Sequence, residues 1–116
     1  MFSQGFIEAD ATEGVIKVVQ AYDAFYNDMS RTAAQPCIEA LSPLNIHDPP
    51  ELSSEQWMKV PRNYILCTED ATVIPETARK EASLYDIPIV TMEAAHCPFI
   101  SKPREFFDVV EGIIQS

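Results

Sequence analysis

Glycine is scarce in this chain, which contains only Gly5, Gly14 and Gly112 among its 116 residues. Glycine-rich phosphate loops and the sharp turns that present a nucleophile need glycines at fixed offsets, because other residues strain in those backbone conformations. None of the three glycines stands in such a cluster. The sequence therefore lacks the signatures of a phosphate-binding loop and of a strand-to-helix nucleophile turn.

Cysteine and histidine are also sparse. The three cysteines, Cys37, Cys67 and Cys97, are odd in number, far apart in the sequence and without a C-x-x-C pair. This pattern argues against a disulfide framework. His47 and His96 are the only histidines, so a structural zinc site is not expected either. His47 is predicted to be a surface residue.

Basic residues and long apolar runs are few as well. The chain has eight lysines and arginines and 18 acidic residues, so its formal charge is −10. Such a surface repels phosphate backbones, so we expect no nucleic-acid partner. The simplest explanation of the acidic charge is that it keeps the protein soluble. No apolar run approaches the ~20 residues of a membrane helix, and the first residues do not resemble a signal peptide. We expect no membrane partner and a cytoplasmic location.

Apolar residues make up 47% of the chain, enough for a core. Prolines divide it into a first zone (1–44), a linker (45–61) and a second zone (62–116). In the first zone, Phe6-Ile7 and Val15–Val18 predict a hairpin, and residues 18–26 have helical spacing. Ser30 is a plausible N-cap of a second helix, which Pro36 should kink or delay. The linker should have little regular structure.

The second zone is more regular. Tyr64–Cys67 is a short apolar run, typical of a strand buried on both faces. Pro75 opens a helix with Ala78, Ala82 and Tyr85 on one side, and a second apolar run covers 87–92. Ser101 is predicted to cap a last helix. That helix carries a broad apolar stripe of Phe106, Phe107, Val109, Val110, Ile113 and Ile114. The order predicts an α/β fold in which a right-handed crossover joins two parallel strands.

An acid and a histidine follow the two predicted strands. Asp70 comes shortly after the first strand, and His96 after the second. Function gathers at the carboxyl ends of strands in such sheets, so these side chains can meet across neighbouring loops. The carboxylate would then hold one imidazole tautomer and stabilise the imidazolium. On this pattern alone, Asp70 can equally be a turn former and His96 a hydrogen-bonded structural residue.

Around these residues the sequence resembles a known family. VPRNYILCTEDATVIPE, AAHCPFISKP and the terminal amphipathic helix look like the C-terminal part of an α/β-hydrolase fold. The nearest branch is the small esterases related to plant methyl esterases and hydroxynitrile lyases. AYDAFYNDMS, with the phenylalanine-tyrosine-asparagine-aspartate stretch before a helix, is similar to that branch's cap, and Trp57 with Val60-Pro61 fits the approach to the strand. The resemblance covers nearly all of this chain but only the later half of the family's domain.

The resemblance implies roles for particular residues. Asp70 would be the acid of a catalytic triad and His96 its base, whereas Glu69 would have no role. Tyr22, Phe25, Tyr26 and Trp57 would line a substrate pocket under the cap, although core packing explains them equally well. The implied fold is two parallel strands with flanking helices plus a small helical cap segment. No metal and no organic cofactor is implied.

The family's nucleophile motif, G-x-S-x-G, is missing from these residues. The motif precedes the acid in the family's chain order, and Ser3-Gln4-Gly5 supplies only half of it. Without a serine and oxyanion donors, an acid–base pair has nothing to activate. Cys97 adjoins His96, but its side chain should point elsewhere, and we interpret it as a packing residue.

A half-domain should expose an apolar strand edge and apolar faces. We therefore expect a truncated or split hydrolase, inactive alone, that pairs with an N-terminal half, self-associates or is poorly stable. If completed, it would hydrolyse a small ester, with cyanohydrin cleavage left open. The alternative is a non-catalytic ligand-binding or assembly module derived from the same fold.

Overall fold

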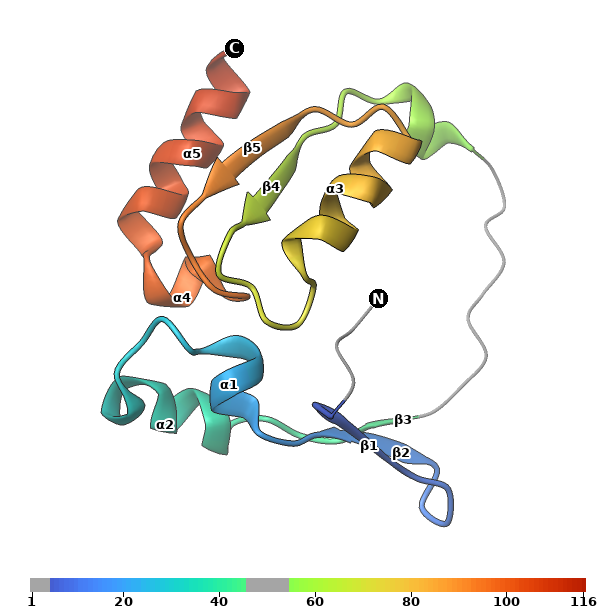
Figure 1. Cartoon of the computed structure of the whole chain (residues 1–116), viewed down its shortest axis with the longest axis vertical. Helices are drawn as coiled ribbons and strands as arrows, with labels where there is room; N and C mark the ends of the chain where they lie inside the picture. The colour runs from blue at the N-terminus through green and yellow to red at the C-terminus, as the bar shows by residue number, and fades with distance from the viewer. Residues whose placement is uncertain (1–4, 46–54) are drawn as a thin grey trace.

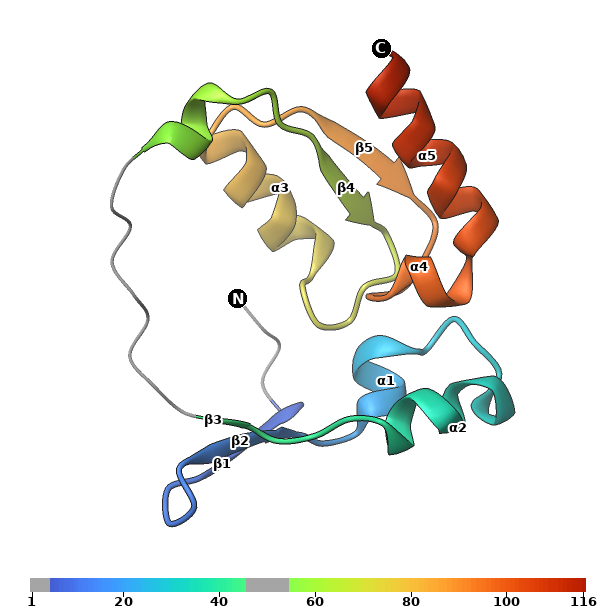
Figure 2. The same ribbon diagram turned by 180° about the vertical axis from the view of Figure 1, so that it is seen from behind.

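The computed structural model describes residues 5–45 and 55–116. The expectations for Ser3 and His47 lie outside these ranges. The described residues form two groups, a sheet with two helices near the N-terminus and a larger group of two strands and three helices (Figure 1). The reverse view shows α1 next to the loops and short helix at one end of the larger group (Figure 2).

The first group begins with an antiparallel hairpin of β1 (Ile7–Asp10) and β2 (Val15–Val18). Asp10 closes the turn because its Oδ1 accepts hydrogen bonds from the backbone N–H groups of Thr12 and Glu13. Gly14 has a φ of 66°, which glycine adopts without strain. The predicted hairpin is thus confirmed. A third strand, β3 (Leu44–Asn45), pairs with β2.

The two helices of the first group differ in part from the predictions. Helix α1 is Ala21–Phe25, and Val18 is the last residue of β2, because cross-strand pairing overrides helical spacing there. Helix α2 is Arg31–Glu39, and Ser30 caps it by accepting a hydrogen bond from the Ala33 N–H at 3.1 Å. Pro36 lies inside α2 and does not delay its start.

The linker contains more regular structure than predicted. Asn45 belongs to β3, and residues Gln56–Lys59 form a single 3-10 helix, η1. Linker residues 46–54 lie outside the described part of the chain. Short pieces of this kind need few residues, so a proline-rich composition does not prevent them.

The second group is built on β4 (Tyr64–Cys67) and β5 (Ile89–Met92), which run parallel in the register Tyr64↔Ile89 to Cys67↔Met92. Helix α3 (Pro75–Leu84) connects them and buries Ala78 and Ala82. Strand, helix and strand therefore follow the predicted order, and Pro75 is at the predicted helix start. Leu66 is the only buried residue of β4. The expectation of a strand buried on both faces was wrong for its half-buried neighbours.

Two further helices end the described chain, α4 (Pro98–Ser101) and α5 (Pro103–Gln115). Ser101 does not cap α5. It ends α4, its hydroxyl donates to Asp28, and the cap position of α5 is Lys102, which makes no side-chain cap. The prediction failed because Pro103, which suits a first helical turn, sets the start of α5.

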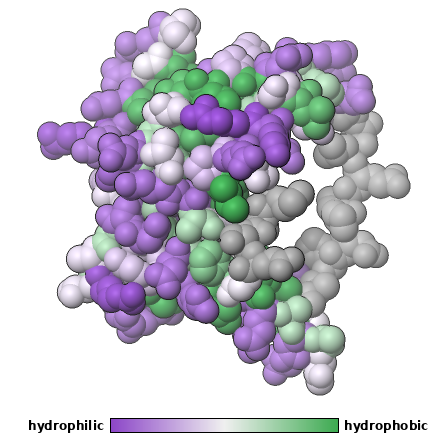
Figure 3. Space-filling model, in the orientation of Figure 1, coloured by the Kyte–Doolittle hydropathy of each residue, from purple (hydrophilic) through white to green (hydrophobic). Residues whose placement is uncertain are grey.

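Apolar surface is exposed around the parallel strands. Figure 3 shows hydrophobic residues gathered between α3 and α5, over β4 and β5. Helix α5 packs beside β5 but buries none of its residues completely, and Phe107 and Ile114 are 62% and 75% exposed. The predicted apolar stripe is present, yet within the described residues only part of it is covered.

Candidate active site

The parallel pairing of β4 and β5 continues beyond the strands and aligns the loops that follow them. The Thr68 N–H donates to the Met92 carbonyl at 2.9 Å, and the Glu69 N–H donates to the Ala94 carbonyl at 3.0 Å. The segments that follow β4 and β5 therefore leave the sheet side by side at its carboxyl edge, where the functional sites of α/β folds lie. One residue past Glu69 is Asp70, and two past Ala94 is His96.

Asp70 and His96 are in direct contact. Nδ1 of His96 lies 3.1 Å from Oδ1 and 3.0 Å from Oδ2 of Asp70. The side chains are 12% and 27% exposed, respectively, so the pair is largely removed from water while the imidazole remains accessible. An ionised carboxylate can only accept hydrogen bonds, so Nδ1 carries the proton, and in a neutral ring the lone pair is then on Nε2. This is the tautomer that a general base needs.

The loop of Asp70 is organised by the same carboxylate. Oδ1 accepts hydrogen bonds from the Thr72 N–H at 2.9 Å and the Val73 N–H at 3.0 Å. Burial raises the pKa of Asp70, but the hydrogen bonds from His96, Val73 and Thr72 outweigh it and hold the pKa below the ordinary value. The carboxylate is therefore ionised near neutral pH and can stabilise an imidazolium.

A short stretch of the first group, residues 24–28, contacts both loops. Thr72, only 2% exposed, donates its hydroxyl to the Ala24 carbonyl at 2.5 Å. The side chain of Asn27 donates to the Glu69 carbonyl at 3.3 Å. The Phe25 ring stacks on the His96 imidazole, with 5.0 Å between centroids and 20° between planes. The first group thus fastens the loop of the acid and covers one face of the histidine.

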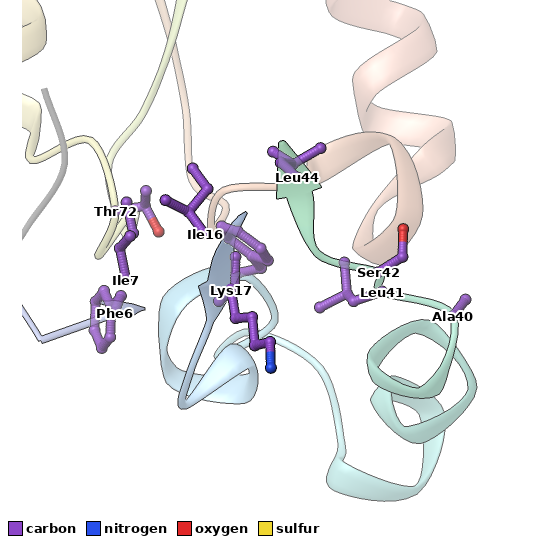
Figure 4. A pocket seen from close by; sticks show the side chains of 11 residues that line it. Phe6, Ile7, Ile16, Lys17, Ala40, Leu41, Ser42, Leu44 and Thr72 are labelled. Atoms are coloured by element: carbon purple, nitrogen blue, oxygen red, sulfur yellow. The ribbon is translucent and has the colours of Figure 1, made fainter. Parts of the chain in front are cut away.

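An apolar cavity of about 410 Å³ adjoins Phe25. Its wall includes Ile16 and Leu44, which are cross-strand partners, so both side chains lie on one face of the three-stranded sheet. Figure 4 shows these residues with Leu41 around the cavity and Thr72 at one side. Because Phe25 and Thr72 also contact the acid–histidine loops, the cavity lies next to the candidate site.

The other aromatic residues predicted to line a pocket lie elsewhere. Tyr22 donates its hydroxyl to the Met29 carbonyl at 2.6 Å and lies under the Arg31 guanidinium. Tyr26 is 4% exposed and packs edge-on against Phe25. Trp57 lies in η1, ahead of the amino end of β4, and packs against Tyr85 at the end of α3. Of the four, only Phe25 lines the cavity, and the structure does not bring Trp57 to it.

Cys97 has the electrostatic environment of a packing residue. Burial raises the pKa of its thiol to about 11, and the carboxylates of Asp70 and Asp28 contribute to the increase. A thiol of this kind is protonated near neutral pH and is a poor nucleophile. Its environment agrees with the interpretation of Cys97 as a packing residue.

Among the residues that contact the site but were not singled out from the sequence are Thr72 and Asp28. Thr72 joins the acid loop to Ala24, and Asp28 accepts a hydrogen bond from the Ala95 N–H. Both are short polar residues in loops, where turn formation is the usual explanation. Asp28 stands in the quoted cap stretch, but nothing in its spacing indicates a contact with a loop 67 residues away.

Within residues 5–45 and 55–116, no three histidine, cysteine, aspartate or glutamate side chains gather to hold a metal ion. In the same ranges, no helix has the length and apolar character needed to cross a membrane.

Comparisons with known proteins agree with this fold. Residues 2–109 match the model of the alpha/beta hydrolase family. Over 60 residues the chain is 33% identical to a probable hydrolase, R7, of Phoma sp., a match that covers 47% of this chain and 25% of R7. The fold superposes on the crystal structure of the pyrethroid hydrolase PytH with a TM-score of 0.72 at 12% identity. That match covers 97% of this chain and 48% of PytH, so the chain spans about half of PytH.

Proposed function

This chain belongs to the alpha/beta hydrolase family, and on that premise we propose that it supplies the acid and base of a site that hydrolyses small carboxylic esters. The contact between Asp70 and Nδ1 of His96 carries the proposal. It joins an ionised, hydrogen-bonded carboxylate to an imidazole whose Nε2 is free, at the carboxyl edge of a parallel sheet. Ester hydrolysis by proton transfer needs this combination together with a nucleophile.

The nucleophile must come from other residues. The 116 residues contain no G-x-S-x-G motif, and the raised pKa of Cys97 leaves it protonated. In a complete site, Nε2 of His96 would take the proton of a serine hydroxyl as that oxygen attacks the ester carbonyl. It would then give the proton to the departing alcohol, while Asp70 stabilises the imidazolium. Alone, the chain is expected to be inactive.

The cavity beside Phe25 indicates the kind of ester. Its lining is largely apolar and includes Ile7, Ile16 and Leu44, so it suits a hydrocarbon part of the substrate. Phe25 touches both the cavity and the imidazole. A substrate with an apolar group in the cavity would therefore hold its ester carbon near His96. The same pair could act on cyanohydrins, because fold and triad alone do not select the reaction.

The first test is an assay of the purified chain on p-nitrophenyl butyrate. We expect no saturable hydrolysis and a rate no greater than that of imidazole at the same total concentration as the histidines of the chain, since a lone imidazole also cleaves activated esters slowly. A fluorophosphonate probe, which labels activated serines, should leave the chain unlabelled. Saturable hydrolysis that disappears in His96→Ala, with one labelled serine, would overturn the claim that the nucleophile lies elsewhere.

The second test supplies the missing part. If the coding DNA immediately upstream encodes an in-frame G-x-S-x-G, the joined polypeptide should hydrolyse the ester and react with the probe. His96→Ala should then lower kcat by roughly 10⁴-fold or more, as removal of a triad member does. Asp86→Asn, in the exposed turn after α3, serves as a control. A joined polypeptide that is active and insensitive to both Asp70→Asn and His96→Ala would refute the assigned roles.

The cavity also supports a second function, ligand binding without catalysis. An apolar fluorescent probe such as a naphthalene sulfonate should then bind the chain and be released by Leu44→Asp, which places a negative charge in the cavity wall and repels the sulfonate. Binding that survives Leu44→Asp would place the probe on the exposed apolar surface instead. Size-exclusion chromatography tests assembly, because Phe107, Ile114 and Leu84 are well exposed. A monomer that binds no N-terminal hydrolase half would argue against both pairing and self-association.

A further inference from the structure

Asp28 joins the first group to the loop that carries the histidine. It lies between α1 and α2, and its Oδ2 accepts two hydrogen bonds from the second group. The Ala95 N–H donates at 2.9 Å, and the Ser101 hydroxyl donates at 2.8 Å. These partners are 67 and 73 residues away in the sequence. Both bonds go to a charged acceptor and are therefore stronger than neutral ones.

The first of these bonds acts directly beside His96. Ala94 and Ala95 are fully buried, and the peptide groups before the histidine are held from two sides. The Ala94 carbonyl accepts from Glu69 in the acid loop, and the Ala95 N–H donates to Asp28. The main chain that enters His96 is thereby held beside the loop of Asp70.

The second bond fixes the main chain that leaves His96. Ser101 ends α4, which begins two residues after the histidine. With its hydroxyl on Asp28, the short helix is anchored to the same carboxylate as Ala95. Phe25, three residues before Asp28, covers the imidazole face. The segment from Phe25 to Asp28 therefore holds the histidine loop on both sides of His96 in the sequence and also covers the face of its ring.

We propose that Asp28 is a positioning residue for the histidine: it acts through the backbone of Ala95 and the hydroxyl of Ser101 to keep Nδ1 of His96 on Asp70. It makes no contact with the reacting atoms and donates no proton. The role of His96 as a base rests on the proposed function. The tautomer of its ring depends only on the contact with Asp70. The test therefore reads the tautomer and not the activity.

The experiment is a two-bond ¹H–¹⁵N spectrum of the 116-residue chain, in buffer alkaline enough to keep imidazoles neutral. A His47→Gln background leaves His96 as the single histidine. The unmodified site should show a protonated Nδ1 and an unprotonated Nε2. Asp28→Ala should lose this pattern, because a loosely held ring exchanges between tautomers and both nitrogens shift to intermediate values. Asp28→Asn should retain it, since both bonds use one oxygen and an amide oxygen can replace Oδ2.

Controls separate positioning from general destabilisation. Asp23→Ala removes an exposed acid of neighbouring α1 and should leave the pattern unchanged. Amide dispersion of β4 and β5 shows whether each variant is folded. If Asp28→Ala does not fold, Asp28→Glu addresses the same question, because it keeps the charge and displaces the oxygens by a methylene group. A fixed Nδ1–H tautomer in a folded Asp28→Ala or Asp28→Glu chain would overturn the proposal.

Discussion

Replacing Asp70 by alanine and by asparagine should give two different losses of stability. The Asp70 side chain is 12% exposed and accepts hydrogen bonds from Thr72, Val73 and His96. Each such bond contributes on the order of 1 kcal/mol. Asp70→Ala removes all three hydrogen bonds, so we expect a loss of about 3 kcal/mol.

Asparagine should spare most of that stability. The Thr72 and Val73 N–H groups both donate to Oδ1, so an asparagine oxygen at that place keeps the turn. Its NH₂ group then faces Nδ1 of His96, which must accept and so move its proton to Nε2. We expect Asp70→Asn to lose about 1 kcal/mol and to invert the His96 tautomer.

Urea unfolding followed by the fluorescence of Trp57, the only tryptophan, measures both stability losses. A two-bond ¹H–¹⁵N spectrum measures the tautomer, and an unchanged m-value shows that each variant unfolds as the parent does. Equal losses for alanine and asparagine would refute the claim that Oδ1 holds the turn. An Nδ1–H tautomer in folded Asp70→Asn would refute the inferred direction of the hydrogen bond.

Three further predictions concern pH, thiol reactivity and the contact between the groups. Since the folded-state pKa of Asp70 is lowered, its ionised form contributes stability above the ordinary aspartate pKa of about 3.9 and loses it as pH falls; urea titrations should show this loss in the parent and a smaller one in Asp70→Asn. With a pKa of about 11, Cys97 should react with a disulfide reagent near neutral pH roughly tenfold more slowly than a free thiol; stopped-flow labelling of a single-cysteine variant checks this, and a rate equal to that of glutathione contradicts it. Thr72→Val should lose about 1–2 kcal/mol with the bond to Ala24, and the exposed Thr91→Val should lose little; similar urea midpoints for both would argue against that bond.

Much of the second group could be predicted from the sequence. Apolar runs at Tyr64–Cys67 and near Ile89–Met92 indicate strands, and Pro75 indicates the start of the helix between them. Parallel strands in that order bring their carboxyl ends together. The meeting of Asp70 and His96 followed from this reasoning. Their catalytic roles, like the pocket roles of Tyr22, Phe25, Tyr26 and Trp57, remain predictions.

Local signals failed where two of them competed. Ser101 has the chemistry of an N-cap, but Pro103 sets the helix start and Asp28 takes the hydroxyl. Val18 fits a helical period, but pairing with Ile7 places it in a strand. In both cases a distant partner or a backbone constraint decided between two acceptable local structures.

The sequence by itself determined the order of the elements and the loops that carry the acid and the histidine, because apolar periodicity and proline placement are local properties of the chain. Only the tertiary structure decided that Phe25 stacks on His96 and that Asp28 holds Ala95 and Ser101. These contacts join segments about 70 residues apart. Their free energy depends on the packed geometry of both groups, which no periodicity within either segment encodes.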